Sequence, residues 1–293
     1  MKRLLTPIKI IKEQSPKGRM ARGVLANIYD KGAITFVQLL TIPLLTGVWG
    51  ADGYGVWLML LTVPTYIALS DLGFGTAAGV VLIQCISEGK ADRANTVLHS
   101  TIAFVMGTVM IAAILAFSFA IWFSLNADVT GPFPREEVAL AIVLITCYAL
   151  VLTQMNIVTV VYRATHKYAF AMIFSGTWIL LEGFSLVFLS SHGFGLVHAA
   201  LAFFLIRLAG YIIFIAILKA KEPWVHVGVC LAQRETIRCL ANPSAASMGL
   251  TLATAASLQG MVLALGITGG PAVVAIFGAA RTLSRAPDRK SVV

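Results

Sequence analysis

Residues 194–218 read FGLVHAALAFFLIRLAGYIIFIAIL, a run of 25 residues with one charged side chain, Arg207. About 20 apolar residues are enough for a helix to cross the hydrocarbon core of a bilayer. An open sheet cannot cross it, because unpaired backbone groups are too costly to leave in lipid. The stretch therefore predicts a membrane-spanning helix.

Similar runs occupy most of the chain, of which 58% is hydrophobic and only 12% is charged. Soluble domains usually carry about 25% charged residues. Eight apolar segments can be drawn, at about 27–49, 54–87, 96–124, 136–162, 169–190, 194–218, 241–267 and 271–281. We expect an all-α integral membrane protein, a polytopic helical bundle with one six-helix lobe plus one full and one partial further helix.

The segments divide the chain into four predicted regions. These are a basic N-terminal segment (1–24), a six-helix transmembrane lobe (25–218), a connector (219–239) and the start of a second lobe (240–293). Lys9 and Lys12 interrupt the apolar part of the N-terminus, which argues against a signal peptide. The last segment, Pro271–Arg281, is too short to span, and a polar tail follows it. A truncated or frame-shifted gene is the preferred explanation, and a re-entrant or interfacial end is the alternative.

The loops alternate in charge along the chain. Twenty of the 22 Lys and Arg residues fall at the N-terminus, in the even-numbered loops or in the tail, whereas Arg135 stands alone on the opposite side. Basic loops stay in the cytoplasm, so the N-terminus is predicted to be cytoplasmic and to lie on anionic lipid. The net charge of +9 is explained by topology, and we expect membrane lipids as partners and no nucleic acid.

Three charged residues inside the apolar segments carry the most information, because charge at the centre of a span is costly. Glu182 and Arg207 flank a predicted hairpin turn near Gly193, at depths that differ by about 4–5 Å at ~1.5 Å per residue. They can form an ion pair near the middle of the bilayer. Two interpretations stay open: a purely structural pair, or an anion-binding Arg207 in a cavity, with Glu182 setting its charge or carrying a proton.

Asp71 lies where the second apolar segment is interrupted. Ser70 and Asp71 precede LGFGTAAG and could cap a second half-helix, and a cap or a hinge is the favoured interpretation. A direct ligand or a proton-carrying role is the alternative.

Polar side chains also form stripes at helical spacing. The residues are Asn27, Lys31, Thr35 and Gln38, then Thr146, Thr153 and Asn156, then Ser247, Thr251 and Thr254. Such residues either join helices in lipid or line a hydrated path, and each stripe alone leaves both open. Three stripes together with a buried Arg favour a hydrated central path.

Other chemistry is poorly represented in the sequence. The chain has no HExxH, GxSxG or Walker motif, and its histidines lack ligand spacing, so we expect no enzyme, no metal and no cofactor. The cysteines form no CxxC pair and are interpreted as small packing residues: Cys85, Cys147, Cys230 and Cys239.

The first two apolar segments resemble a known family. Pro43-Leu44, WGADGYGVW at 49–57, SDLGFGTA at 70–77 and EGKADRA at 88–94 are similar to O-antigen and polysaccharide flippases, in the polysaccharide transporter family of the multidrug/oligosaccharidyl-lipid/polysaccharide exporter superfamily. VYRATHKY at 161–168 and ARTLSR at 280–285 fit the same family less specifically.

This resemblance implies two six-helix lobes around a central cavity in the bacterial inner membrane. It implies alternating-access movement of undecaprenyl-diphosphate-linked oligosaccharide for O-antigen, lipopolysaccharide or other polysaccharide biosynthesis. Polysaccharide assembly proteins are further partners that it suggests. The predicted substrate-binding residues are Arg207, Lys31, Gln38, Asn156 and Thr254. Asp71 and Glu182 are the predicted coupling or hinge residues, for protons or sodium.

Three alternatives accompany this expectation. A multidrug or cation antiporter of the same superfamily should have an acidic cavity, which Arg207 and Lys31 disfavour. An inactive truncated fragment would follow from the missing second lobe. A membrane polysaccharide polymerase or ligase needs a large external loop, but the longest predicted one is only about 124–135.

Overall fold

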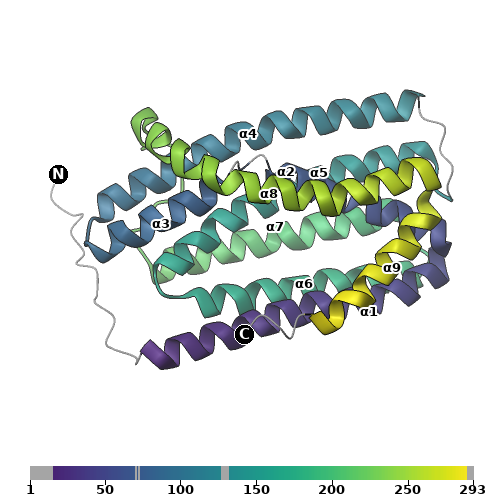
Figure 1. Cartoon of the computed structure of the whole chain (residues 1–293), viewed down its shortest axis with the longest axis horizontal. Coiled ribbons are helices and arrows are strands. Elements are labelled where there is room, and N and C mark those ends of the chain that lie inside the picture. The colour runs from purple at the N-terminus through teal and green to yellow at the C-terminus, as the bar shows by residue number, and fades with distance from the viewer. Residues whose placement is uncertain (1–15, 70, 72, 127–131, 289–293) are drawn as a thin grey trace.

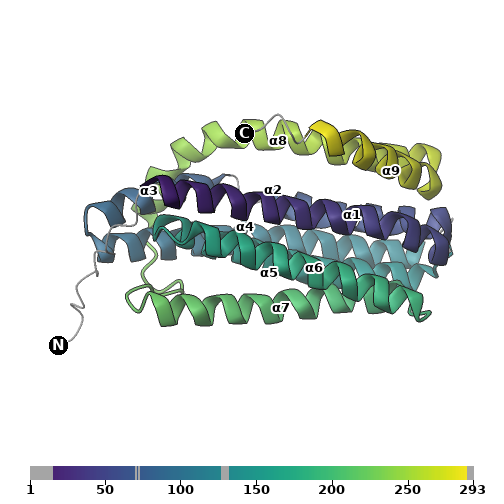
Figure 2. The same ribbon diagram turned by 90° about the horizontal axis from the view of Figure 1, so that it is seen from below.

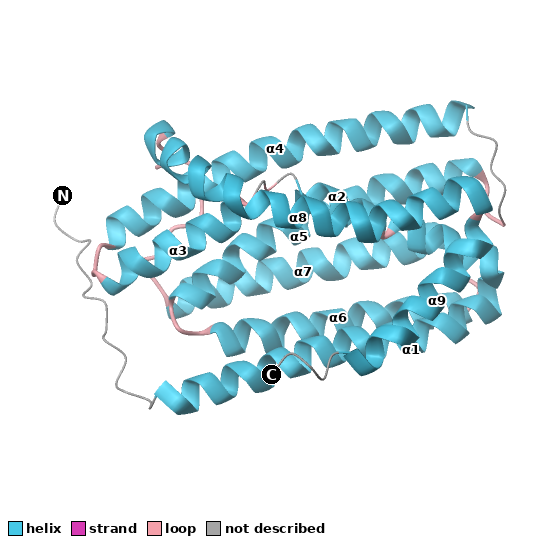
Figure 3. Ribbon diagram, viewed as in Figure 1, coloured by secondary structure: helices cyan, strands magenta, loops and turns pink. Residues whose placement is uncertain are grey.

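The computed structural model describes residues 16–69, 71, 73–126 and 132–288, which form nine α-helices and no strand (Figures 1 and 3). The helices are α1 (Pro16–Leu60), α2 (Thr62–Leu69), α3 (Phe74–Ser87), α4 (Ala91–Asn126), α5 (Arg135–Ala164), α6 (Tyr168–Ser191), α7 (Leu196–Lys221), α8 (Arg234–Gly269) and α9 (Pro271–Asp288). The predicted all-α, polytopic membrane class is confirmed.

Five helical stretches among the described residues are long and apolar enough to cross a bilayer. They are Met20–Leu69, Ala91–Asn126, Arg135–Ala164, Tyr168–Ser191 and Leu196–Lys221. The first contains two crossings, because α1 bends sharply at Gly50, which has φ 72° and ψ 175°. Glycine adopts this backbone conformation readily. The indole rings of Trp49 and Trp57 then lie 6.2 Å apart across the bend.

The second crossing is broken between α2 and α3. The Oδ1 atom of Asp71 accepts a hydrogen bond from the Gly75 amide at 2.8 Å, and its carbonyl accepts one from the Phe74 amide at 3.0 Å. These contacts satisfy two amides at the start of α3 that lack a partner in the preceding turn. The structure thus contains the capping contact expected of Asp71, whereas Ser70 lies outside the described residues.

Two helix boundaries differ from the expectation. α9 does not stop at Arg281 but continues to Asp288, because loss of apolar character does not prevent a helix from continuing. Thr282, for example, still donates to the Gly278 carbonyl at 2.9 Å. Both ends of the predicted connector 219–239 belong to helices, because α7 ends at Lys221 and α8 begins at Arg234. The connector between them is residues 222–233.

The α1–α7 lobe (residues 16–221) packs around α5. More than half of the most apolar window of α5, 56%, is buried, compared with 17–28% for the other candidate spans. α1 approaches α6 closely, since a Cβ at Gly176 would press on Tyr29 and one at Gly183 would collide with Val37. Small residues permit such close helix packing in lipid.

α8 and α9 lie together against one side of the α1–α7 lobe (Figure 2). Close contact occurs at the turn between them, where a Cβ at Gly55 would collide with the backbone of Pro271. Further along α9, a Cβ at Gly278 would press on Leu58. α8 contacts α2 through a hydrogen bond of 3.3 Å from Gln259 Nε2 to Thr65 Oγ1.

The connections alternate between the two ends of the bundle (Figure 1). The short turns after α3 and α5 and the 222–233 segment lie at one end, here called the basic end because it holds Lys90, Arg93, Arg163 and Lys167. The bend in α1 lies at the opposite end, since Gly50 lines a pocket with Gly270 and Pro271, and the turns before α7 and α9 lie there too. The cytoplasmic placement of the basic end stays a prediction.

Candidate functional site

The predicted ion pair is present inside the lobe. Arg207 Nη2 on α7 lies 2.6 Å from Glu182 Oε2 on α6, and it donates to Tyr148 Oη on α5 at 3.2 Å. Glu182 and Arg207 are each 3% exposed. Arg207 Nη1 also faces the Met155 sulfur at 3.7 Å. Tyr148, Glu182 and Arg207 are hereafter called the intramembrane cluster, and they connect α5, α6 and α7.

The Glu182–Arg207 pair has no net charge, but two of its polar atoms lack a hydrogen bond within the described part of the chain. Arg207 Nε and Glu182 Oε1 are buried and have no hydrogen-bond partner among the described residues. Burial of an ion pair is favourable only when its geometry and remaining hydrogen bonds are good. In this conformation the guanidinium of Arg207 therefore lies between helices of one lobe and not on a surface open to a ligand.

A polar surface is formed instead by α1, which has three distinct faces. Ala26 and Ala33 are buried on the face that packs in the bundle. A second face exposes large apolar residues, which suits contact with lipid: Leu25, Ile28, Phe36 and Leu39. The third face exposes the polar side chains of Asn27, Lys31 and Gln38, with Thr35 half-buried between them.

This polar face suits water better than lipid tails. Ionisable residues within membrane spans face the bundle interior or a water-filled cavity. The side chain of Lys31 is 58% exposed, although it lies between apolar residues along α1. Asn156, on the central helix α5, is also exposed. Among the predicted substrate-binding residues, Lys31, Gln38 and Asn156 are thus accessible and Arg207 is not, while the side chain of Thr254 lies outside the described part of α8.

A buried carboxylate beside this face was missed by the sequence reasoning. Asp30 is 5% exposed, and its Oδ1 atom has no hydrogen-bond partner among the described residues. Its Oδ2 atom lies 3.6 Å from Lys31 Nζ. The adjacent pair Asp30-Lys31 inside an apolar segment was the available signal. Lys31 also continues the run of basic residues at the N-terminus, which hides this pair in the sequence.

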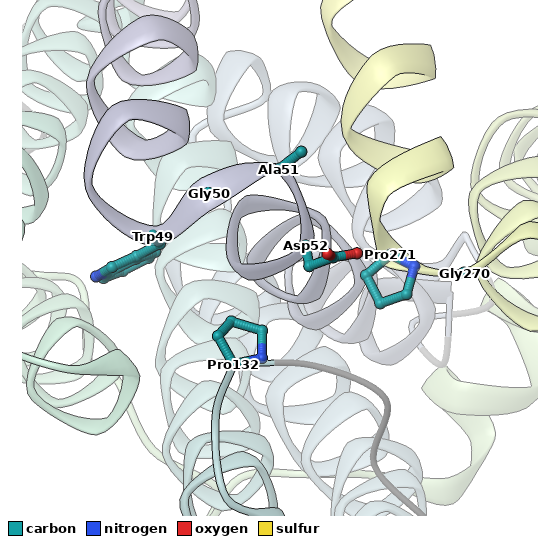
Figure 4. A pocket seen from close by; sticks show the side chains of 7 residues that line it. All are labelled: Trp49, Gly50, Ala51, Asp52, Pro132, Gly270 and Pro271. Atoms are coloured by element: carbon teal, nitrogen blue, oxygen red, sulfur yellow. The ribbon is translucent and has the colours of Figure 1, made fainter.

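The opposite end carries a pocket of about 570 Å³ beside the α8–α9 turn (Figure 4). Its lining residues are Trp49, Gly50, Ala51, Asp52, Pro132, Gly270 and Pro271. Asp52 Oδ1 accepts a hydrogen bond of 3.1 Å from the Ala272 amide, at the first turn of α9. The pocket therefore lies where the α1–α7 lobe holds the start of α9.

The cysteines correct one expectation. Cys85 is buried, as a packing residue should be, and Cys147 is partly buried. Cys230 and Cys239 are exposed, so the packing interpretation is wrong for these two. They lie outside the apolar spans, on the connector and on the first turns of α8, and their side chains point away from the hydrophobic cluster that buries Val225 and Leu240. Within the described residues, no group of three or more His, Cys, Asp or Glu side chains could hold a metal ion.

No protein-family model and no curated protein matches the chain. Solved structures do match at low identity. A chain described as protein A is 12% identical, with a TM-score of 0.75 over 96% of this chain and 63% of that chain. The MATE multidrug transporter DinF-BH, solved as a complex with a ligand, is 12% identical, with a TM-score of 0.65 over 92% of this chain and 63% of that chain.

A third match is a MOP superfamily transporter from Pyrococcus furiosus, described as having a binding pocket of reverse polarity that suggests a different function. It is 16% identical, with a TM-score of 0.59 over 92% of this chain and 60% of that chain. The chain therefore has the fold of transporters of this kind, and it spans about 60–63% of the length of these solved structures.

Proposed function

We propose that this protein is part of an alternating-access membrane transporter that moves undecaprenyl-diphosphate-linked oligosaccharide across the bacterial inner membrane. The transporter class is supported by the shared fold of known transporters. Alternating access in such proteins is rocking of one bundle against another around a central site. The contact between the α1–α7 lobe and the α8–α9 pair at Gly55 and Pro271 is the described place where such rocking would act.

The polar face of α1 is the observation that carries the substrate assignment. Lys31 provides an exposed cation on a spanning helix, and Asn27 and Gln38 extend the face along the helix. A diphosphate head group needs a fixed cation and hydrogen-bond donors in a wet path, and lysine binds phosphate as a point charge. The oligosaccharide would meet the amide groups of this face, with Asn156 supplying a further one from α5.

The buried pair takes a different part in this proposal. Arg207 is neutralised by Glu182, and so it positions α5, α6 and α7 instead of contacting the substrate in this conformation. A direct role for Arg207 would require Glu182 to release it in another conformation. Coupling to protons or sodium through Asp71 or Glu182 remains a prediction.

A multidrug transporter is the second candidate, and two observations favour it. The DinF-BH transporter shares the fold and is described as a multidrug transporter. In addition, the buried carboxylate of Asp30 lies 3.6 Å from Lys31 Nζ and offsets part of its positive charge. A cationic drug would then be attracted to Asp30 if Lys31 turned away.

Binding to the full 293-residue chain in lipid nanodiscs, measured by native mass spectrometry, distinguishes the two candidates. We expect undecaprenyl-diphosphate-linked oligosaccharide to bind more tightly than tetraphenylphosphonium, a lipophilic cation that serves as the drug probe. Lys31→Ala should weaken diphosphate binding about 10–100-fold, because a hydrogen bond to a charged group contributes ~1.5–3 kcal/mol. Lys31→Arg should retain most of the binding.

Lys90→Ala is the matched control, since Lys90 is an exposed cation in a turn at the basic end. It should leave both affinities unchanged. Tighter binding of tetraphenylphosphonium, strengthened further by Lys31→Ala, would replace the oligosaccharide proposal with the multidrug one. Binding of neither ligand would count against both.

A further inference from the structure

The connector between α7 and α8 is fixed to α4 by an unusual set of hydrogen bonds. Three buried side chains on α4, Asn95, His99 and Ser100, all contact the backbone of residues 222–233. The bonds are Asn95 Nδ2 to the Trp224 carbonyl (2.8 Å), the His226 amide to Asn95 Oδ1 (3.0 Å), His99 Nε2 to the His226 carbonyl (2.7 Å), the Leu231 amide to His99 Nδ1 (3.1 Å) and the Gln233 amide to Ser100 Oγ (2.9 Å).

His99 lies at the centre of this set and contacts two separate parts of the connector. Its Nδ1 atom accepts from the Leu231 amide, so the Nε2 atom must carry the proton that is donated to the His226 carbonyl. The neutral Nε2–H tautomer is therefore the form that satisfies both contacts. Only a side chain with a donor and an acceptor at suitable positions can replace it.

Two further contacts hold the connector to the α1–α7 lobe. Val225 is 2% exposed and belongs to the same hydrophobic cluster as Leu98 on α4. At the start of the segment, Glu222 forms a salt bridge of 2.6 Å with Lys167, in the turn before α6. The connector is thus attached at its beginning, its middle and its end.

Attachment of this kind changes how α8 can move. A flexible linker of 12 residues would have a root-mean-square span of about 20 Å, which would leave α8 loosely tethered. Here the last attachment, the Gln233 amide on Ser100, directly precedes the first helical residue, Arg234.

We propose that residues 222–233 form a latch that fixes the basic end of α8 to α4, so that α8 pivots at Gln233–Arg234. The latch is independent of the substrate that the protein carries, and it concerns how the two parts of the fold move against each other. In any such movement, α4 and the first turn of α8 stay together unless the hydrogen bonds of Asn95, His99 and Ser100 break.

Hydrogen–deuterium exchange on the full chain in nanodiscs tests this proposal through the amides that the latch holds. His99→Leu removes both hydrogen bonds of the ring while keeping an apolar side chain on α4. We expect it to raise exchange in peptides covering 222–233 at least tenfold and to leave α5–α7 unchanged. His198→Leu, at an exposed histidine on α7, is the matched control and should change nothing in 222–233.

His99→Gln tests the hydrogen bonds separately from the fold. Glutamine offers an amide donor and a carbonyl acceptor, so protection of 222–233 should stay within about threefold of the wild type. If exchange in His99→Gln rises as much as in His99→Leu, the hydrogen-bond latch is wrong. Unchanged exchange in His99→Leu would overturn it as well.

Cys230 provides an independent readout, because this exposed thiol lies within the connector. A nitroxide on Cys230, in a Cys147→Ser/Cys239→Ser background, should give a restrained spectrum in the otherwise native chain. His99→Leu should give a mobile one, and His99→Gln a restrained one. A mobile spectrum with native His99 would contradict the latch.

Discussion

The intramembrane cluster and the latch are two buried polar networks built on different principles. The cluster uses a charged pair, Glu182 and Arg207, and leaves one polar atom on each without a partner among the described residues. The latch uses neutral side chains and backbone groups, and His99 makes a hydrogen bond through each of its ring nitrogens. The difference reflects what surrounds each network. When one partner is lost, the cluster is left with a buried charge, whereas the latch is left with a neutral polar group.

The largest effect is expected where one member of the charged pair is removed. Arg207→Met should lower the free energy of unfolding by about 3–5 kcal/mol, because Glu182 is then left buried without its counter-charge. The measurement is the unfolding equilibrium of the full chain in detergent micelles. A loss below about 1 kcal/mol would mean that water or another group replaces Arg207, and the contrast with the latch would fail.

The double variant Glu182→Gln/Arg207→Met separates burial of charge from loss of packing. With both charges removed, the free energy of unfolding should return to within about 1–2 kcal/mol of the wild type, since neutral replacements of buried pairs are often tolerated. A double variant as unstable as Arg207→Met would show that the pair supplies a specific geometry that neutral side chains cannot. Oligosaccharide binding should be retained in the double variant if Arg207 only positions helices.

A smaller effect is expected at the latch. Asn95→Ala leaves the His226 amide and the Trp224 carbonyl without their partner, which should cost about 1–3 kcal/mol or less where water reaches them. The same detergent unfolding experiment gives the free energy, and Asn126→Ala is the control, because the exposed side chain of Asn126 donates to the Trp122 carbonyl of its own helix. Equal losses in Asn95→Ala and Arg207→Met would remove the distinction between the two networks.

These networks also show what the sequence could predict. The spans and the Glu182–Arg207 pair follow from apolar length and from residue counts along two helices joined by a short turn, so both were within reach. The latch was not, because His99 and Leu231 are 132 residues apart and nothing in their local sequence relates them. The position of a loop against a distant helix depends on the tertiary structure. The depth of a residue in a membrane span follows from the number of residues between it and the end of the helix.

The candidate functional site could be predicted only in part from the sequence. The polar stripe of Lys31 and Gln38 was visible as a helical pattern, and the structure places it on an exposed face. Burial of Arg207 away from any open surface could not be seen, since sequence spacing gives depth along a helix but not which neighbour the side chain meets. The sequence WGADG likewise predicts a turn, but it does not show that the backbone of Gly50 folds α1 back on itself.

A still smaller effect is expected at Asp71, which belongs to neither network. Its carboxylate is half-buried and caps α3 through the Gly75 amide, at the break in the second crossing. Asp71→Ala should lower the free energy of unfolding by about 0.5–2 kcal/mol, the usual contribution of a cap, and Asp71→Asn should recover most of it. If Asp71→Asn is stable but abolishes binding or transport, the charge itself is needed, and the cap interpretation is incomplete.

The smallest effect is expected for the exposed pair at the turn between α3 and α4. Lys90 Nζ lies 2.7 Å from Glu88 Oε2, and this hydrogen bond, together with one from Gln84, holds the pKa of Glu88 below its ordinary value. A lowered carboxylate pKa gives stability that is present above the ordinary pKa and is lost as the pH falls. Because both side chains are well exposed, solvent screens the attraction, and Lys90→Ala should leave the unfolding midpoint unchanged between about pH 4 and 7. A clear pH-dependent loss of stability in Lys90→Ala would show that this turn is less hydrated than its exposure indicates. Charges at the basic end would then contribute to stability as charges in the intramembrane cluster do.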